Sequence, residues 1–228
     1  MIDALYILGR GSKHEDMELR LSLRCLEENA RNIDRVFIVG NCPDWVRNVK
    51  HIPAEDTWTA ENNAFQKILR ACETDISNDF LLMNDDFFML QPFSAEDYPY
   101  FCRGYLEDRI SSDPYGKSIE KTCTFLKEHG KKKPVDFEVH CPIRINKGAF
   151  SLLKDTAESV KHDDNGLLCR SIYCNIFNKT GVGCKDPKIR NDIWEEPDLT
   201  GCISTSDDCD SILKELEKRF TNKSRWEK

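Results

Sequence analysis

The sequence predicts an α/β fold, with a mostly parallel, twisted sheet and helices on both of its faces. Short apolar runs alternate with segments of helical period along residues 1–90. The first strand–helix–strand unit, from Ala4 to Gly40, spans about 35 residues, which is the size of a crossover between two parallel strands. In such a sheet, ligands bind beyond the carboxyl ends of the strands.

Four strands are expected in this half, because each is a short apolar run bounded by turn residues. They are residues 4–8, 35–40, 49–53 and 79–83. Two intervening stretches, 16–30 and 59–73, repeat apolar residues at helical spacing, as Leu19, Leu23 and Leu26 do. These stretches are the expected crossover helices.

The pattern weakens after Leu90. Residues 92–116 are rich in aromatic side chains and indicate loops, whereas helices are expected at 117–129 and 148–161 and a strand at 135–142. The type of the element at 167–178 stays open. A strand at 201–204 and an amphipathic helix end the chain, with Asp210 or Ser211 as the expected N-cap.

The 228 residues fit a single catalytic domain. We expect residues 1–90 to form a nucleotide-binding α/β half and residues 91–228 an acceptor-side half with a C-terminal helix. The net charge of −7 and the pI near 5.4 disfavour a nucleic-acid partner, because phosphate contacts need clustered Lys and Arg.

The chain has 11 cysteines, and no two follow the CxxC spacing. We expect no signal peptide and no membrane span, since a basic leader and a long apolar run are both lacking. Free thiols in a reducing cytoplasm are therefore expected. A zinc site at Cys169 and Cys174 is an alternative, although their spacing matches no common ligand pair.

The strongest candidate site is the acidic turn Asn84-Asp85-Asp86, between the apolar runs 80–83 and 87–90. Adjacent carboxylates repel each other, and Mg²⁺ or Mn²⁺ would relieve that repulsion through oxygen ligands. Such a metal could also neutralise a diphosphate. The alternative is a plain turn with solvated carboxylates.

Two further segments are candidates. The loop Gly9-Arg10-Gly11-Ser12 joins a strand to a helix, so its amides could face a phosphate, or it could be an ordinary turn. His140 follows an apolar stretch and suits proton transfer near neutral pH. Arg170 and Lys147 could bind phosphate oxygens. The alternative is a core histidine with surface cations.

Three segments together resemble the Stealth family of sugar-1-phosphate transferases, whose core is similar to the GT-A-type nucleotide-diphospho-sugar transferase fold. Residues 18–27 look like the family's ELRYSLRSLE helix, and residues 80–88 look like its FLYLNDDFFF segment. His140-Cys141-Pro142 is similar to its HxP element, with Arg170 downstream. The chain also looks like short bacterial and phage glycosyltransferases that share the NDD turn and an ending like residues 223–227.

The resemblance implies roles for individual residues. Asp85 and Asp86 would hold the metal and the donor diphosphate, His140 would be the acid or base, and Arg170 would steady the transferring phosphate. Other positions would bind the donor or brace its pocket: Gly9, Arg10, Gly11, Ser12, Glu18, Arg20, Arg24, Asn63, Asn84 and Lys147. One departure is that residues 8–13 lack the acid of the family's VDGSDP-like loop.

These features favour a metal-dependent transferase that uses a nucleotide-activated sugar. It would move a glycosyl or a sugar-1-phosphate group to a hydroxyl acceptor such as a polysaccharide, with His140 or Glu138 as the base. One alternative is a nucleotide- or sugar-binding module without turnover. Another is a phage-type glycosyltransferase acting on modified DNA bases, which the acidic pI disfavours.

Overall fold

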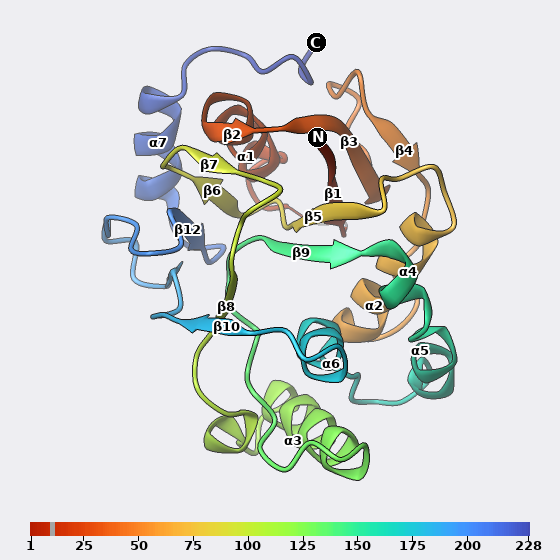
Figure 1. The fold of residues 1–228 in the computed structure, drawn as a ribbon. Coiled ribbons are helices and arrows are strands. Elements are labelled where there is room, and N and C mark those ends of the chain that lie inside the picture. Colours follow the sequence, from red (N-terminus) through yellow and green to blue (C-terminus); the bar gives the residue numbers. More distant parts are fainter. Residues whose placement is uncertain (10–11) are drawn as a thin grey trace.

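The computed structural model describes residues 1–9 and 12–228. Its centre is a sheet with the strand order β4-β3-β1-β5-β9 (Figure 1). Strands β1 (Ile2–Leu8), β3 (Ile33–Gly40), β4 (Lys50–Ile52) and β5 (Asp79–Met83) are parallel. Strand β9 (Ile143–Asn146) joins β5 in the antiparallel direction. All four strands expected in the first half are present.

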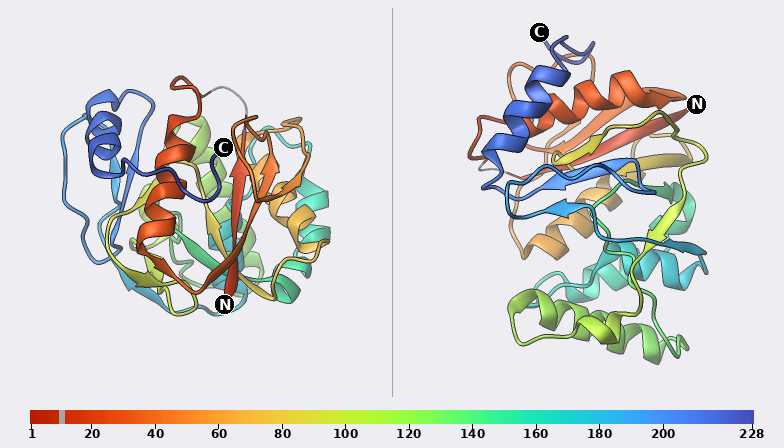
Figure 2. Two further views of the ribbon diagram at one scale, coloured as in Figure 1. Left: turned by 90° about the horizontal axis from the view of Figure 1, so that it is seen from above. Right: turned by 90° about the vertical axis from the view of Figure 1, so that its left-hand side faces the viewer.

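The pleat of this sheet divides its apolar side chains between two cores, because successive residues of a strand point to opposite faces. Leu5 and Phe37 lie in one core, whereas Ala4 and Tyr6 lie in the other. Helices cover both faces (Figure 2). The predicted α/β fold, a mostly parallel sheet between helices, is therefore confirmed.

One face carries α1 (Met17–Asn29), and α7 (Asp210–Arg219) packs beside it. Between α7 and the central sheet lies a small sheet of β11 (Lys188–Ile189), β12 (Cys202–Thr205) and β6 (Phe87–Met89). Strand β6 begins directly after the acidic turn and pairs with β12 in the antiparallel direction. This small sheet brings Lys188 and Ser204 to the turn.

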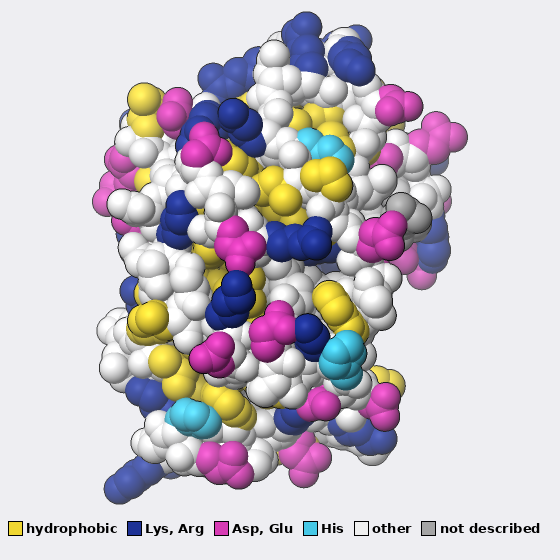
Figure 3. Space-filling model, turned by 90° about the vertical axis from the view of Figure 1, so that its right-hand side faces the viewer, with side chains coloured by type: hydrophobic (Ala, Val, Ile, Leu, Met, Phe, Trp, Pro, Cys, Tyr) yellow, Lys and Arg dark blue, Asp and Glu magenta, His cyan; other side chains and the backbone are white. Residues whose placement is uncertain are grey.

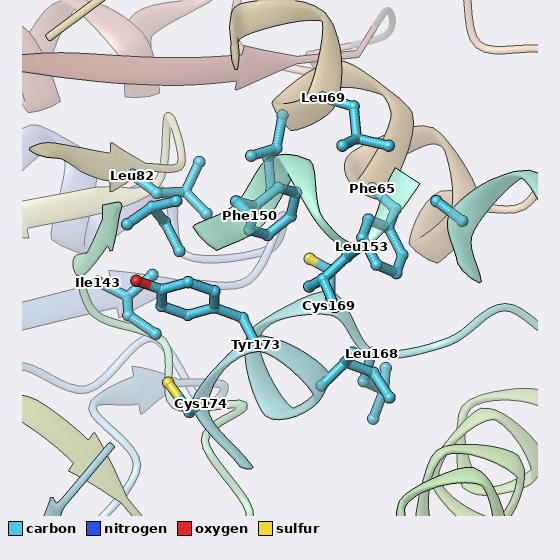
Figure 4. Close-up of a cluster of buried hydrophobic side chains, with 14 of the residues drawn as sticks. Phe65, Leu69, Leu82, Ile143, Phe150, Leu153, Leu168, Cys169, Tyr173 and Cys174 are labelled. Atoms are coloured by element: carbon cyan, nitrogen blue, oxygen red, sulfur yellow. The ribbon is translucent and has the colours of Figure 1, made fainter. Parts of the chain in front are cut away.

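The other face carries α2 (Ala60–Cys72), α4 (Lys147–Ser151), α5 (Lys154–Val160) and α6 (Cys169–Ile176). Figure 4 shows Phe65, Phe150 and Tyr173 from three of these helices meeting Leu82 and Ile143 of the sheet. Helix α3 (Pro114–Glu128) packs outside α6, as Figure 2 also shows.

The remaining elements are short. Strand β2 (Ala30–Arg31) pairs with β7 (Phe93–Ser94), and β8 (Tyr100–Cys102) pairs with β10 (Gly181–Gly183). The 3₁₀ helix η1 (Leu106–Arg109) precedes α3. Within the described residues, no helix is long and apolar enough to cross a membrane, and the 11 cysteines are free.

Three expectations for the second half are wrong. Residues 135–142 form no regular strand: Val135 makes only an isolated bridge to Tyr105, and beyond it side chains take backbone amides, as where the amide of Phe137 donates to Ser171 Oγ at 3.1 Å. The expected helix at 148–161 is two short helices, α4 and α5. Neither expected residue caps α7; Asp192, from the loop between β11 and β12, accepts from the amides of Ser211 and Ile212 instead.

Candidate active site

The acidic turn ends β5, at the carboxyl edge of the parallel strands. The amide of Phe87 donates to the carbonyl of Asn84 at 3.3 Å and closes the turn. Asp86 is held by two residues of the small sheet, since its Oδ2 accepts from Lys188 Nζ at 2.7 Å and from Ser204 Oγ at 2.6 Å. The orientation of Asp86 is therefore fixed before any ligand binds.

Asp85 lies in a different environment. Burial raises the pKa of its carboxyl to about 7, and the charges of Asp86 and Glu18 act in the same direction. Lys188 lowers this pKa, but by less than burial raises it. The turn thus has an excess of negative charge at Asp85, which a bound cation would neutralise.

A cavity of about 210 Å³ lies over the turn. Gly9, Ser12 and Glu18 line it from the first loop and α1, opposite Asp85 and Asp86. Ser12 Oγ donates to Glu18 Oε2 at 2.9 Å and accepts from the amide of Asp16 at 3.0 Å, so it also joins the loop to the helix. Arg10 and Gly11 lie outside the described residues.

A larger cavity of about 790 Å³ opens at the carboxyl ends of β3 and β4. Lys67 forms part of its wall and donates to the carbonyl of Leu8 at 2.6 Å and to Asp56 Oδ1 at 2.5 Å. Because Leu8 and Gly9 line the smaller cavity, Lys67 and Asp56 separate the two spaces at the end of β1.

Asn63 shapes the rim of this larger cavity. Its Oδ1 accepts from the amides of Thr57 and Trp58 at 3.1 and 3.0 Å, and its Nδ2 donates to the carbonyl of Trp58 at 2.8 Å. These bonds fix Trp58 at the edge of the space. On the face seen in Figure 3, which includes β4 and α5, Lys and Arg side chains alternate with Asp and Glu.

A third pocket, of about 80 Å³, lies on the other side of the turn and contains His140, Glu138 and Arg170 beside Asn84. The His140 ring contacts Asp186 through Nδ1, at 2.9 Å from Oδ1. Burial raises the pKa of the Glu138 carboxyl, which the charge of Arg170 partly offsets. The turn therefore lies between the cavity of about 210 Å³ and a pocket that contains an imidazole, a carboxyl and a guanidinium group.

Arg170 is buried, with 8% of its surface exposed. Its Nη1 donates to the carbonyls of Val139 and Cys141 at 2.7 and 2.8 Å, whereas Nη2 has no partner among the described residues. A buried unpaired donor is costly. The free N–H groups are suited to an anionic oxygen that enters the pocket.

Three other candidates lie away from these pockets. Arg20 and Arg24 both pair with Glu227, at 3.2 and 2.8 Å, and so brace α1 against the C-terminal segment. Lys147 lies at the amino end of β5, where its Nζ donates to the carbonyl of Thr74 at 2.6 Å. Lys147 is therefore at the opposite end of the sheet from the turn, and the structure does not bring it to the phosphate side of the candidate site.

The oxygen atoms available at the turn partly match the ligands of a divalent cation. Carboxylate oxygens are the ligands that Mg²⁺ and Mn²⁺ prefer, and the pKa of Asp85 is raised first by burial and then by the charge of Asp86. Among the described residues, no group of three or more His, Cys, Asp or Glu side chains is arranged to hold a metal. A metal would therefore take only some of its ligands from this chain.

Sequence reasoning missed Lys188, Ser204 and Asp186. Lys188 and Ser204 come from strands more than 100 residues after the turn, at separations of 102 and 118 residues from Asp86. Asp186 stands in a loop, next to Pro187. No local pattern marks these residues, because only the small sheet and its loop bring them to the site.

The fold is similar to that of the galactosyltransferase LgtC. LgtC in complex with donor and acceptor sugar analogues matches over 98% of both chains, with a TM-score of 0.55 and 10% identity. An active-site mutant of LgtC gives the same values. The GT-A-type fold is therefore confirmed.

HddC from Yersinia pseudotuberculosis also matches, at 16% identity. The match covers 39% of this chain and 49% of HddC, and its TM-score of 0.28 is too low to indicate a shared fold. No protein-family model matches the chain, and no curated protein matches it.

Proposed function

We propose that the chain is a transferase that uses a nucleotide-activated sugar and moves the sugar, or its 1-phosphate, to a hydroxyl acceptor such as a glycan. The observation that carries the proposal is the acidic turn between two unlike spaces. A cavity of about 210 Å³ lies over Asp85 and Asp86, with the larger cavity of about 790 Å³ beyond Lys67, and a small pocket with His140, Glu138 and Arg170 lies on the other side of the turn. The GT-A-type fold agrees with this assignment.

In this proposal, the nucleoside occupies the cavity bordered by Trp58 and Asn63. Its diphosphate crosses the end of β1, next to Gly9 and Ser12, and reaches Asp85 and Asp86. A divalent cation held there by the two carboxylates would supply positive charge to the diphosphate. Lys188 keeps Asp86 in place, and Glu18 supports the loop through Ser12.

The acceptor hydroxyl enters from the pocket of His140. Its oxygen forms the new bond to the donor, its proton passes to the imidazole, and the bond to the departing nucleotide breaks with the electron pair leaving on phosphate. The free Nη2 of Arg170 binds an anionic oxygen during this step. These steps need residues 1–90 and 91–228 together, so we propose that both halves form one catalytic domain.

The bond that breaks decides between two versions of the proposal. In glycosyl transfer, the hydroxyl attacks the anomeric carbon and a nucleoside diphosphate leaves. In the sugar-1-phosphate transfer implied by the Stealth-like residues 18–27 and 80–88, it attacks phosphorus and a nucleoside monophosphate leaves. Phosphorus NMR of the released nucleotide separates the two outcomes.

A thermal-shift screen of nucleotide-sugars, with and without Mn²⁺, tests donor binding first. A ligand that binds only the folded state raises the melting temperature. Asp85→Ala should abolish the metal-dependent part of the shift, because it removes a proposed metal ligand. The fold should remain intact, because Asp85 has no side-chain partner among the described residues. A shift without turnover would instead support a binding module, and no shift with any donor would refute the proposal.

His140→Ala tests the other side of the turn. We expect turnover to fall about 100-fold or more, while the affinity for the donor stays within about twofold. His129→Ala is the control, since that ring stacks on Phe125 at the end of α3. An equal loss of binding and turnover in His140→Ala would indicate a structural histidine.

A further inference from the structure

The ring of His140 is held from one side by a single carboxylate. Asp186 Oδ1 lies 2.9 Å from His140 Nδ1 and also accepts the backbone amide of His140 at 3.0 Å. A residue that binds both the amide and the ring of one histidine fixes its side-chain rotation. The other ring nitrogen, Nε2, has no partner among the described residues.

Asp186 is itself held in place. Its Oδ2 accepts from Arg103 Nη1 at 2.5 Å, and Arg190 Nη2 lies 3.6 Å away. Arg103 also donates to Asp136 at 3.1 Å, a carboxylate whose side chain is fully buried. Both oxygens of Asp186 are thus occupied by donors, and the carboxylate has no freedom to turn away.

The charge state of Asp186 follows from these contacts. Burial on its own would raise the pKa of this carboxyl, but hydrogen bonds from His140 and the charge of Arg103 outweigh it and hold the pKa well below its usual range. Asp186 is therefore ionised at neutral pH and only accepts hydrogen bonds. The proton of a neutral His140 must then be on Nδ1, which leaves a lone pair on Nε2.

We propose that Asp186 is the positioning residue of the transfer step: it fixes the tautomer and the orientation of His140, so that Nε2 receives the proton of the acceptor hydroxyl. This inference rests on the proposed function. When Nε2 takes the proton, the ring becomes a cation, and the adjacent carboxylate stabilises it. Asp186 does not touch the substrate; it acts only through His140.

An amide cannot replace this carboxylate. Asn at position 186 has one oxygen, whereas the His140 amide, Nδ1 and Arg103 are three donors that need acceptors on both sides of the group. If its oxygen faces Arg103, its NH₂ faces Nδ1 and moves the ring proton to Nε2. If its oxygen faces His140, its NH₂ opposes the guanidinium of Arg103.

The decisive measurement is the ¹⁵N NMR spectrum of the imidazole rings, which is tractable because the chain has five histidines. His140→Gln identifies the signals of His140. We expect the Nδ1–H tautomer in the wild type and a smaller share of that tautomer in Asp186→Asn, because one of the two amide orientations moves the proton to Nε2. A neutral wild-type ring that carries its proton on Nε2 overturns the proposal. This NMR measurement on the wild type requires neither turnover nor a variant at position 186.

Kinetics give the second test. Asp186→Asn should lower kcat about 100-fold with the donor KM nearly unchanged, and should cost nothing more in a His140→Ala background. Asp192→Asn is the matched control, because Asp192 caps α7 and should affect the melting temperature but not kcat. A separate loss from Asp186→Asn in the His140→Ala background would overturn the proposal. If the tautomer is as expected but no donor is turned over, the proposed function fails and the positioning contact stands.

Discussion

Lys188 reaches Asp86 across 102 residues of sequence, and its Nζ lies 2.7 Å from Asp86 Oδ2. Both side chains have 17% of their surface exposed, so the pair is screened only in part by water. The same Nζ donates to the carbonyl of Thr205 in β12. One lysine thus joins the acidic turn to the small sheet and supplies a positive charge to it.

Lys188→Met should increase the effect of divalent metal on stability. Without the ammonium, Asp85 and Asp86 repel each other with less compensation, so the metal-free protein should melt at a lower temperature. Added Mn²⁺ should then raise the melting temperature by more than it does in the wild type. Lys185→Met is the control, because Lys185 pairs with Glu195 on the exposed surface. Equal Mn²⁺ shifts in the wild type and Lys188→Met would contradict the prediction.

Asp85→Asn should stabilise the metal-free protein at pH 8 but not at pH 4. The pKa of Asp85 is raised from 3.8 to about 7 by burial and by Asp86. Folding therefore favours the protonated form: stability is highest below pH 3.8 and is lost as the pH rises to about 7. Asn removes this loss, because it carries no charge at any pH.

Melting temperatures measured between pH 4 and pH 8 check this expectation. The difference between Asp85→Asn and the wild type should grow as the pH rises, by about 10 °C in total, since a pKa of about 7 against 3.8 corresponds to about 4 kcal/mol and 1 kcal/mol shifts the melting temperature of a chain of this size by about 2–4 °C. Asp207→Asn, on the rim of the same cavity, should show no such slope. A constant difference across the range would mean that Asp85 is not a source of the pH dependence.

The first 90 residues could be predicted because each element there carries its own signal. In β1 and β5, successive side chains point alternately into the two cores, so both kinds of position are apolar. The two strands therefore appear in the sequence as apolar runs with sharp ends. The acidic turn was visible for the same reason, as polar residues between two such runs. Local pattern and global fold agree in this half.

The second half could be predicted only in part: α3, β12 and α7 lie close to expected elements, but in the segment around His140 distant side chains satisfy much of the backbone. The apolar segment around His140 has the sequence pattern of a strand, but its backbone amides donate to Ser171 and Asp186, and its carbonyls accept from Arg170. The spacing of apolar residues in the sequence does not reveal such contacts. The residues that orient the site, Lys188 and Asp186, are set by tertiary structure alone.

Loss of Glu227 should destabilise the protein without weakening donor binding. The side chain of Glu227 is fully buried, and Arg24 donates to both of its oxygens, at 2.8 and 2.9 Å. Removing one partner of such a pair leaves a charge uncompensated, so Glu227→Ala should lower the free energy of unfolding by about 3–5 kcal/mol. Urea unfolding measures this loss.

The same pair decides what Arg24 does. If it braces α1, Arg24→Met should destabilise the fold about as much as Glu227→Ala, and neither variant should change the donor dissociation constant at a temperature where both are folded. Glu215→Ala, in α7, is the control, since Glu215 pairs with Lys218 on the exposed surface and its loss should cost less than about 0.5 kcal/mol. If donor binding weakens in Arg24→Met but not in Glu227→Ala, Arg24 itself contacts the nucleotide. Glu227→Ala removes the ion pair that holds α1 but leaves the Arg24 guanidinium in place.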